Sequence, residues 1–140
     1  MFHPWRVLRS HAYVTLLRHD SGPAGFTRFP EATISLRRDL TQVERRCTLT
    51  HELQHVIRGP FLEHNRAKEE AAVERASARL LIGVRELGEA LAWAHNPHEA
   101  ADELWVDVAT LRARLDHLHP AERAYLKRRL SVESDTVRPC

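Results

Sequence analysis

A five-residue segment, His51-Glu52-Leu53-Gln54-His55, constrains this chain more than any other part of its sequence. It has the pattern H-E-x-x-H. On an α-helix the two imidazoles lie one turn apart on the same face, and the carboxylate of Glu52 lies beside them. Two histidines so placed can bind Zn²⁺, while the glutamate acts as general base on a water molecule. The pattern therefore predicts a zinc site that contains His51 and His55, with Glu52 as the catalytic residue.

The residues on either side of this segment favour the helix. Thr41-Gln42-Val43-Glu44 has the form of a capping box, in which the Thr41 hydroxyl and the Glu44 carboxylate each accept a backbone N–H of the other residue. Gly59 suits the backbone conformation that ends a helix, and Pro60 prevents its continuation. The sequence thus predicts a helix over residues 42–58.

The apolar residues of this predicted helix recur at helical spacing. They form one stripe, which consists of Leu49, Leu53, Val56 and Ile57, with Val43 at its edge. His51 and His55 lie just off the stripe, and Glu52 lies on its other side. We therefore expect the stripe to pack against the core and the histidines to face a cleft beside it.

A catalytic zinc site needs a third protein ligand, and a second predicted helix, over residues 67–82, offers candidates. The core-facing track of this helix is Val73, Ser77, Leu80 and Val84. Glu70 falls on the same side when the track is continued backwards. A carboxylate that faces the core is costly unless a charge or a metal satisfies it. We therefore predict Glu70 as the third ligand.

Three other residues remain alternatives for the third ligand. Glu69 lies on the flank of the second helix. Glu74 lies one turn after Glu70, where it could instead orient a zinc-binding histidine from outside the coordination sphere. Cys47 lies four residues before His51 on the same helix face. A thiolate binds zinc well, although a lone helical cysteine is more often a small buried residue.

The first 38 residues are predicted to form a small sheet. Residues 5–9 and 13–17 are short apolar runs, and residues 20–23 have the composition of a turn. Residues 32–37 alternate between polar and apolar side chains, as a strand with one buried face does. The expected fold class is therefore α+β, with a small N-terminal antiparallel sheet beside the H-E-x-x-H helix and a helical part that follows.

The last third of the chain is predicted to be helical. The expected helices cover residues 86–94, 97–104, 108–118 with Asp107 as N-cap, and 120–129. The pair before Pro120 is similar to a helix-turn-helix, with Arg112 and Arg114 pointing outward. A net charge of +2 is low, however, and Asp116 beside these arginines suits phosphate contact poorly. A packing role is favoured over direct DNA binding.

Composition sets further bounds. A chain of 140 residues suits a single domain, which is expected to cover residues 1–130. Within it we expect a part with the sheet over residues 1–83 and a helical part over residues 84–130. Residues 131–140 are expected to form a frayed tail. No apolar run has the length of a membrane span, no signal-peptide core is present, and two cysteines do not make a disulfide framework. The expected compartment is the cytoplasm.

Since the chain has 10 histidines, His64 is interpreted as a surface residue.

Three segments in this order, residues 48–55, 78–82 and 103–115, resemble the ImmA/IrrE family of metallopeptidases, and the resemblance covers about residues 31–130. It implies a zinc endopeptidase that cleaves helix-turn-helix transcriptional repressors and thereby switches phage, mobile-element or stress genes. Carried over, His51 and His55 are zinc ligands and Glu52 is the general base. In zinc peptidases of this plan an edge strand beside the metal helix binds the extended substrate, a role expected here for residues 32–37.

The sequence thus predicts a zinc-dependent endopeptidase with a protein substrate. The alternative is a regulatory or binding module of helix-turn-helix type, whose zinc site is structural or inactive.

Overall fold

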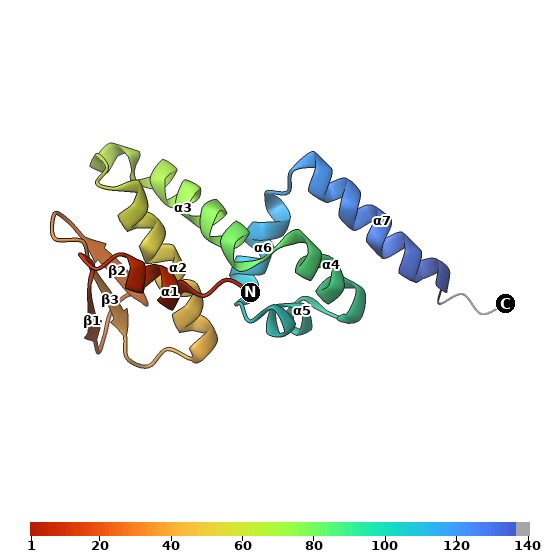
Figure 1. Ribbon diagram of the computed structural model, residues 1–140, viewed down its shortest axis with the longest axis horizontal. Helices are drawn as coiled ribbons and strands as arrows, with labels where there is room; N and C mark the ends of the chain where they lie inside the picture. The colour runs from red at the N-terminus through yellow and green to blue at the C-terminus, as the bar shows by residue number, and fades with distance from the viewer. Residues whose placement is uncertain (137–140) are drawn as a thin grey trace.

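The elements of the protein follow one another with short connections, and the computed structural model describes residues 1–136 of the chain (Figure 1). In chain order they are α1 (Pro4–Ser10), β1 (Thr15–His19), β2 (Gly25–Arg28), β3 (Thr33–Arg37), α2 (Gln42–Arg58), the 3-10 turn η1 (Glu63–Asn65), α3 (Arg66–Leu81), α4 (Val84–Trp93), α5 (Pro97–Leu104), α6 (Val108–Asp116) and α7 (Pro120–Thr136). The predicted α+β class is confirmed. Within the described residues no helix combines the length and apolar character that crossing a membrane requires.

The sheet is mixed, so the prediction of an antiparallel sheet was wrong in part. Its strand order is β1-β3-β2; β3 pairs with β2 in antiparallel fashion and with β1 in parallel fashion. Because only residues 29–32 separate β2 from β3, these two strands form a hairpin. β1 then takes the other edge of β3. The strand predicted as an edge, residues 32–37, is therefore the central strand.

The N-terminal segment over residues 5–9 is a helix, α1, where a strand was predicted. Pro4 occupies the first turn of this helix, where its fixed φ is already helical. Periodicity alone does not separate a strand from one helical turn in an apolar run this short. The predicted strand over 13–17 exists but lies two residues later, at β1.

The helix α2 begins and ends where the sequence predicted. Thr41 Oγ1 accepts from the amide of Glu44 at 3.1 Å, and the Glu44 carboxylate accepts from the amide of Thr41 at 3.0 Å, so the capping box is confirmed. Gly59 ends the helix with a φ of 85°. Ile57, however, is 51% exposed and was wrongly placed in the buried stripe. At 3.6 residues per turn it lies about 80° round the helix from Leu49.

The helix α2 lies between two hydrophobic clusters. The sheet core joins α2 to the sheet and consists of Ala32, Ile34, Leu36, Leu40, Leu49, Leu53 and Val56. The helical core consists of Cys47, Leu81, Ile82, Leu87, Ala90, Ala100, Ala101, Leu104, Val106, Leu111 and Leu126. From α2, Cys47 is a buried member of this second cluster, and the partly buried Val43 packs against it. In Figure 1 the sheet accordingly lies on one side of α2, while α4 to α7 extend away from its other side.

The second predicted helix, over 67–82, is α3, and its track is buried at Val73 and Ser77. Leu80, predicted on the same track, is 41% exposed. At this end of α3 the buried residues are Ala78 and Leu81, because the helix there packs on the helical part of the protein.

Arg46 on α2 is a buried cation that gathers the backbone carbonyls of three segments. Its guanidinium donates to Trp105 O at 2.7 Å, Phe2 O at 3.1 Å and Leu104 O at 3.4 Å, and approaches Leu81 O at 3.5 Å. Two of these segments are the C-terminal ends of α3 and α5, where carbonyls lack helical partners and the helix dipole favours positive charge. Burial lowers the pKa of the Arg46 guanidinium from its usual value.

Arg114 on α6 is also buried, whereas the sequence predicted that it points outward. Its Nε donates to Ile82 O, at the C-terminal end of α3, at 2.8 Å, and its guanidinium is paired with Glu122 at the start of α7. Glu122 also accepts from Arg79 of α3 at 2.8 Å. Hydrogen bonds from Arg114 hold the pKa of Glu122 well below its usual range. Outward-pointing Arg112, by contrast, was predicted correctly.

The other C-terminal predictions are largely confirmed. Asn96 caps α5 and Asp107 caps α6 through bonds to the amides of Glu99 and Thr110. The last helix, α7, was predicted to end at residues 127–129 but continues to Thr136. Part of the predicted tail is therefore helical, and residues 137–140 lie outside the described part of the chain.

We expect Arg46→Met to lower the free energy of unfolding by about 3 kcal/mol, because it leaves buried carbonyls without donors. Urea unfolding followed by circular dichroism measures the effect. Arg112→Met, at an exposed arginine of α6, is the matched control and should change stability by less than about 0.5 kcal/mol. Equal stability of the two variants would contradict the role given to Arg46.

Candidate metal centre

Three side chains converge between α2 and α3. The carboxylate of Glu70 on α3 bridges the two imidazoles of α2: its Oε2 lies 3.0 Å from His51 Nε2, and its Oε1 lies 3.1 Å from His55 Nε2. The ligand atoms of the three residues all lie within 4.8 Å of one another. They can therefore reach one ion together. The structure brings together the three residues that the sequence singled out as a ligand set.

The chemistry of this group fits zinc. Two imidazole nitrogens and one carboxylate oxygen are a donor set that zinc accepts, with a fourth position left for water or substrate. The His55 side chain is 7% exposed, whereas His51 and Glu70 are 31% and 42% exposed. One side of the group is thus enclosed by protein and the other is open to solvent. A water molecule or another ligand could therefore reach an ion held by these three residues.

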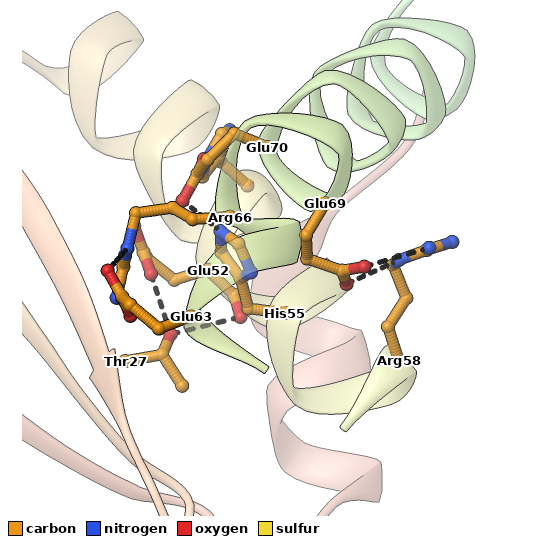
Figure 2. A network of polar contacts seen from close by, with 9 residues as sticks. Thr27, Glu52, His55, Arg58, Glu63, Arg66, Glu69 and Glu70 are labelled. Carbon is orange, nitrogen blue, oxygen red and sulfur yellow. Dashed lines mark hydrogen bonds and ion pairs between the residues drawn. The ribbon is translucent and has the colours of Figure 1, made fainter. Parts of the chain in front are cut away.

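Glu52 lies next to this group on α2 and is buried, although it carries a carboxylate. The hydroxyl of Thr27 on β2 donates to Glu52 Oε2 at 2.6 Å and approaches the Glu52 backbone oxygen at 3.3 Å. Figure 2 shows Thr27 beneath Glu52, with His55 and Glu70 close by. The bond fixes one carboxylate oxygen. Sequence reasoning missed Thr27, because nothing local in a short strand marks it.

Gly25, also on β2, allows the sheet to approach α2 this closely. A Cβ atom at this position would lie 2.6 Å from Cγ2 of Thr48 and 3.3 Å from Cγ of Glu52. A side chain at residue 25 would therefore push β2 away from α2 and separate Thr27 from Glu52. The glycine was not singled out in the sequence, since its importance depends on a neighbour that is distant in the chain.

The alternative ligands lie elsewhere. Glu69 forms a bidentate pair with Arg58, with distances of 2.6 and 3.0 Å, and hydrogen bonds from Arg58 lower its pKa (Figure 2). Glu74 is exposed on α3, and in the described residues it makes no bond to either histidine. Cys47 belongs to the helical core, where burial raises the pKa of its thiol. His64 is exposed, as predicted.

Two clefts flank the centre, and both are lined by Glu52 and Gly25. The first, of about 300 Å³, lies between α2, α3 and α6 and also takes in His51. The second, of about 460 Å³, lies beside β2 and η1 and takes in His55 and Glu70. Its wall is aromatic and includes Phe26, Phe29 and Phe61. The centre is thus accessible from both sides.

Comparison with known proteins found no match to this chain. The chain matches no protein-family model, no curated protein and no solved structure.

Removal of Glu70 tests the ligand set. We expect the purified wild-type protein to bind one zinc ion per chain. Removal of a residue that only hydrogen-bonds to a metal ligand lowers metal affinity by roughly 10–100-fold, and Glu70→Ala should lower the zinc affinity by more than this. Competition with a fluorescent chelator measures the affinity. Glu74→Ala, one turn further along the same helix, is the control and should bind zinc as the wild type does. The opposite result for the two variants would assign the third ligand to Glu74.

Proposed function

We propose that this protein is a zinc-dependent endopeptidase in which His51, His55 and Glu70 hold the metal and Glu52 is the catalytic residue. One observation carries the proposal. A convergent histidine–histidine–carboxylate group lies beside a buried glutamate, in a position that is open to solvent. A purely structural zinc site has no need of such a glutamate or of an open side.

Bound zinc would supply a Lewis acid that polarises the peptide carbonyl and lowers the pKa of water. The protein itself contributes proton transfer through Glu52. Because Thr27 holds Oε2 of Glu52, the other carboxylate oxygen can accept a proton from the attacking water. Glu52 then gives the proton to the amine nitrogen that leaves. Burial beside the sheet keeps this carboxylate in one place throughout.

The substrate is proposed to bind as an extended chain along β2. The sequence suggested residues 32–37 for this role, but β3 is paired on both sides and has no free edge. Among the described strands β2 lies at an edge of the sheet; it packs against α2 through Thr27 and Gly25 and borders both clefts. An added strand on this edge would pass directly beside Glu52.

The nature of the substrate rests on resemblance. The likeness of residues 48–55, 78–82 and 103–115 to ImmA/IrrE peptidases points to a transcriptional repressor of the helix-turn-helix type, and to a role in phage, mobile-element or stress gene control. We place this activity in the cytoplasm, where such repressors act.

The second candidate is a regulatory or binding module whose helix-turn-helix-like segment, α5 and α6, contacts DNA. The described contacts of α6 favour packing instead. Arg114 is used inside the protein, and Thr110 and Ala113 face the first cleft. A helix engaged in this way presents few groups to phosphates. Salt-dependent, sequence-selective DNA binding without proteolysis would support this second candidate.

The glutamate is tested directly by Glu52→Gln. We expect this variant to bind zinc normally but to cleave at least about 100-fold more slowly, because no group remains to accept the proton. Suitable substrates are the helix-turn-helix repressors encoded in the same genome, each incubated with the zinc-loaded protein and analysed by mass spectrometry. Full activity in the variant would exclude the proposed mechanism.

Thr27 is tested as a positioning residue. Thr27→Val keeps the shape of the side chain and removes its hydroxyl, so kcat should fall about tenfold, as expected for one lost hydrogen bond to a charged group, while KM and zinc affinity stay unchanged. Thr27→Ser retains the hydroxyl and should restore kcat. A loss that Thr27→Ser does not restore, or one that appears in zinc affinity, would indicate a structural role only.

A further inference from the structure

The first cleft, between α2, α3 and α6, has features that the metal centre does not use. It shares His51 and Glu52 with the centre, so a group that enters it lies next to these two residues. Much of its wall is built from small side chains, namely Ala24, Gly25, Ala78, Ala109 and Ala113. Its volume of about 300 Å³ lies at the small end of ligand sites. It therefore suits one side chain rather than a separate ligand.

The charged residues that line this cleft are acidic. They are Glu52 from α2, Glu74 from α3 and Asp107 at the start of α6; of the described residues, no lysine or arginine lines the cleft. Carboxylates that face one cleft from several sides add their negative potentials and attract a cation. An anionic side chain, or a nucleic-acid phosphate, would be repelled here.

Ser77 supplies a polar group inside the same cleft. The residue is 5% exposed, and within the described part of the chain its Oγ has no hydrogen-bond partner. Buried hydroxyls without partners are uncommon, because the lost bond to water is not replaced. A hydrogen-bond donor that reaches this oxygen from the cleft would satisfy it. The small apolar wall and the polar groups together match a side chain with an apolar stem and a cationic, donor-bearing end.

We propose that this cleft is a specificity pocket for a lysine or arginine side chain of the protein substrate, at a residue next to the bond that is cleaved. The inference rests on the proposed peptidase function, and it adds a substrate preference to it. Ser77, Glu74 and Asp107 are the residues that set the preference, while Glu52 and His51 connect the pocket to the reaction.

Cys47 allows the charge of the pocket to be measured without any proteolysis. It lines the cleft, and burial together with the negative charge of Asp107 raises the pKa of its thiol. In a Cys140→Ser background it is the sole thiol of the chain. The experiment compares its reaction rates with a cationic reagent, aminoethyl methanethiosulfonate, and an anionic one, sulfonatoethyl methanethiosulfonate, in the zinc-loaded protein. The rate of each reagent with Cys47 is divided by its rate with free cysteine. The thiolate fraction of Cys47 is the same for both reagents, so it cancels when the two normalised rates are compared.

We expect the cationic reagent to be favoured roughly tenfold or more. Asp107→Asn, which keeps a good helix cap, and Glu74→Gln should each lower this preference severalfold. Glu89→Gln removes the same charge at an exposed site of α4 and should leave the ratio unchanged. A ratio near one, or one that is insensitive to Asp107 and Glu74, would overturn the proposal. A third reagent, methyl methanethiosulfonate, is small and neutral. Its failure to react with Cys47 would also overturn the proposal, since the cleft would then be closed to side chains.

A second arm uses cleavage of a peptide library by the zinc-loaded protein, with sites identified by mass spectrometry. We expect lysine and arginine to be enriched at one position adjacent to the cleaved bond. Ser77→Ala should reduce kcat/KM for these peptides severalfold, and not for matched peptides with leucine at that position. Cleavage with no basic preference would overturn the pocket and leave the peptidase intact. A cation-selective thiol with no cleavage of peptides or repressors would instead overturn the peptidase, and the substrate role of the pocket with it.

Discussion

The helix α2 is packed between two hydrophobic cores, and this packing positions the elements around it. One face of the helix, through Leu49 and Leu53, is fixed against the sheet, while Cys47 enters the helical core. The strip of helix surface between these two contacts is the part that carries His51 and His55. Because α2 is packed on both sides, the two histidines are held facing α3, where Glu70 completes the candidate ligand set.

The two buried arginines maintain this arrangement at the far end of α3. Arg46 and Arg114 reach the carbonyls of Leu81 and Ile82 from opposite elements, α2 and α6. Helix ends inside a protein need such donors, and a positive charge there also suits the helix dipole. The arginines therefore set how α3 lies against α2 and α6. That placement decides both the position of Glu70 and the shape of the first cleft.

The centre combines groups with different structural origins. The histidines and Glu52 come from one helix, Glu70 comes from the next, and Thr27 comes from the sheet. The position of each group depends on a different packing contact. The geometry of the centre therefore requires that α2, α3 and the sheet are all packed correctly. The acidic cleft extends this centre toward α6. The helical part thus contributes to the site through Asp107 at the start of α6, in addition to stabilising the core.

Neighbouring residues along one helix were enough to predict three features: the limits and capping box of α2, the spacing of His51 and His55, and the side of α3 that bears Glu70. These depend on 3.6-residue periodicity and on local capping, which require no partner. Four features depend instead on the fold as a whole: the mixed sheet, the central position of β3, the burial of Arg114 and the bond from Thr27 to Glu52. In each of these, the partner is distant in the chain. Strand order and the choice between surface and interior follow from long-range packing, which a single segment does not encode.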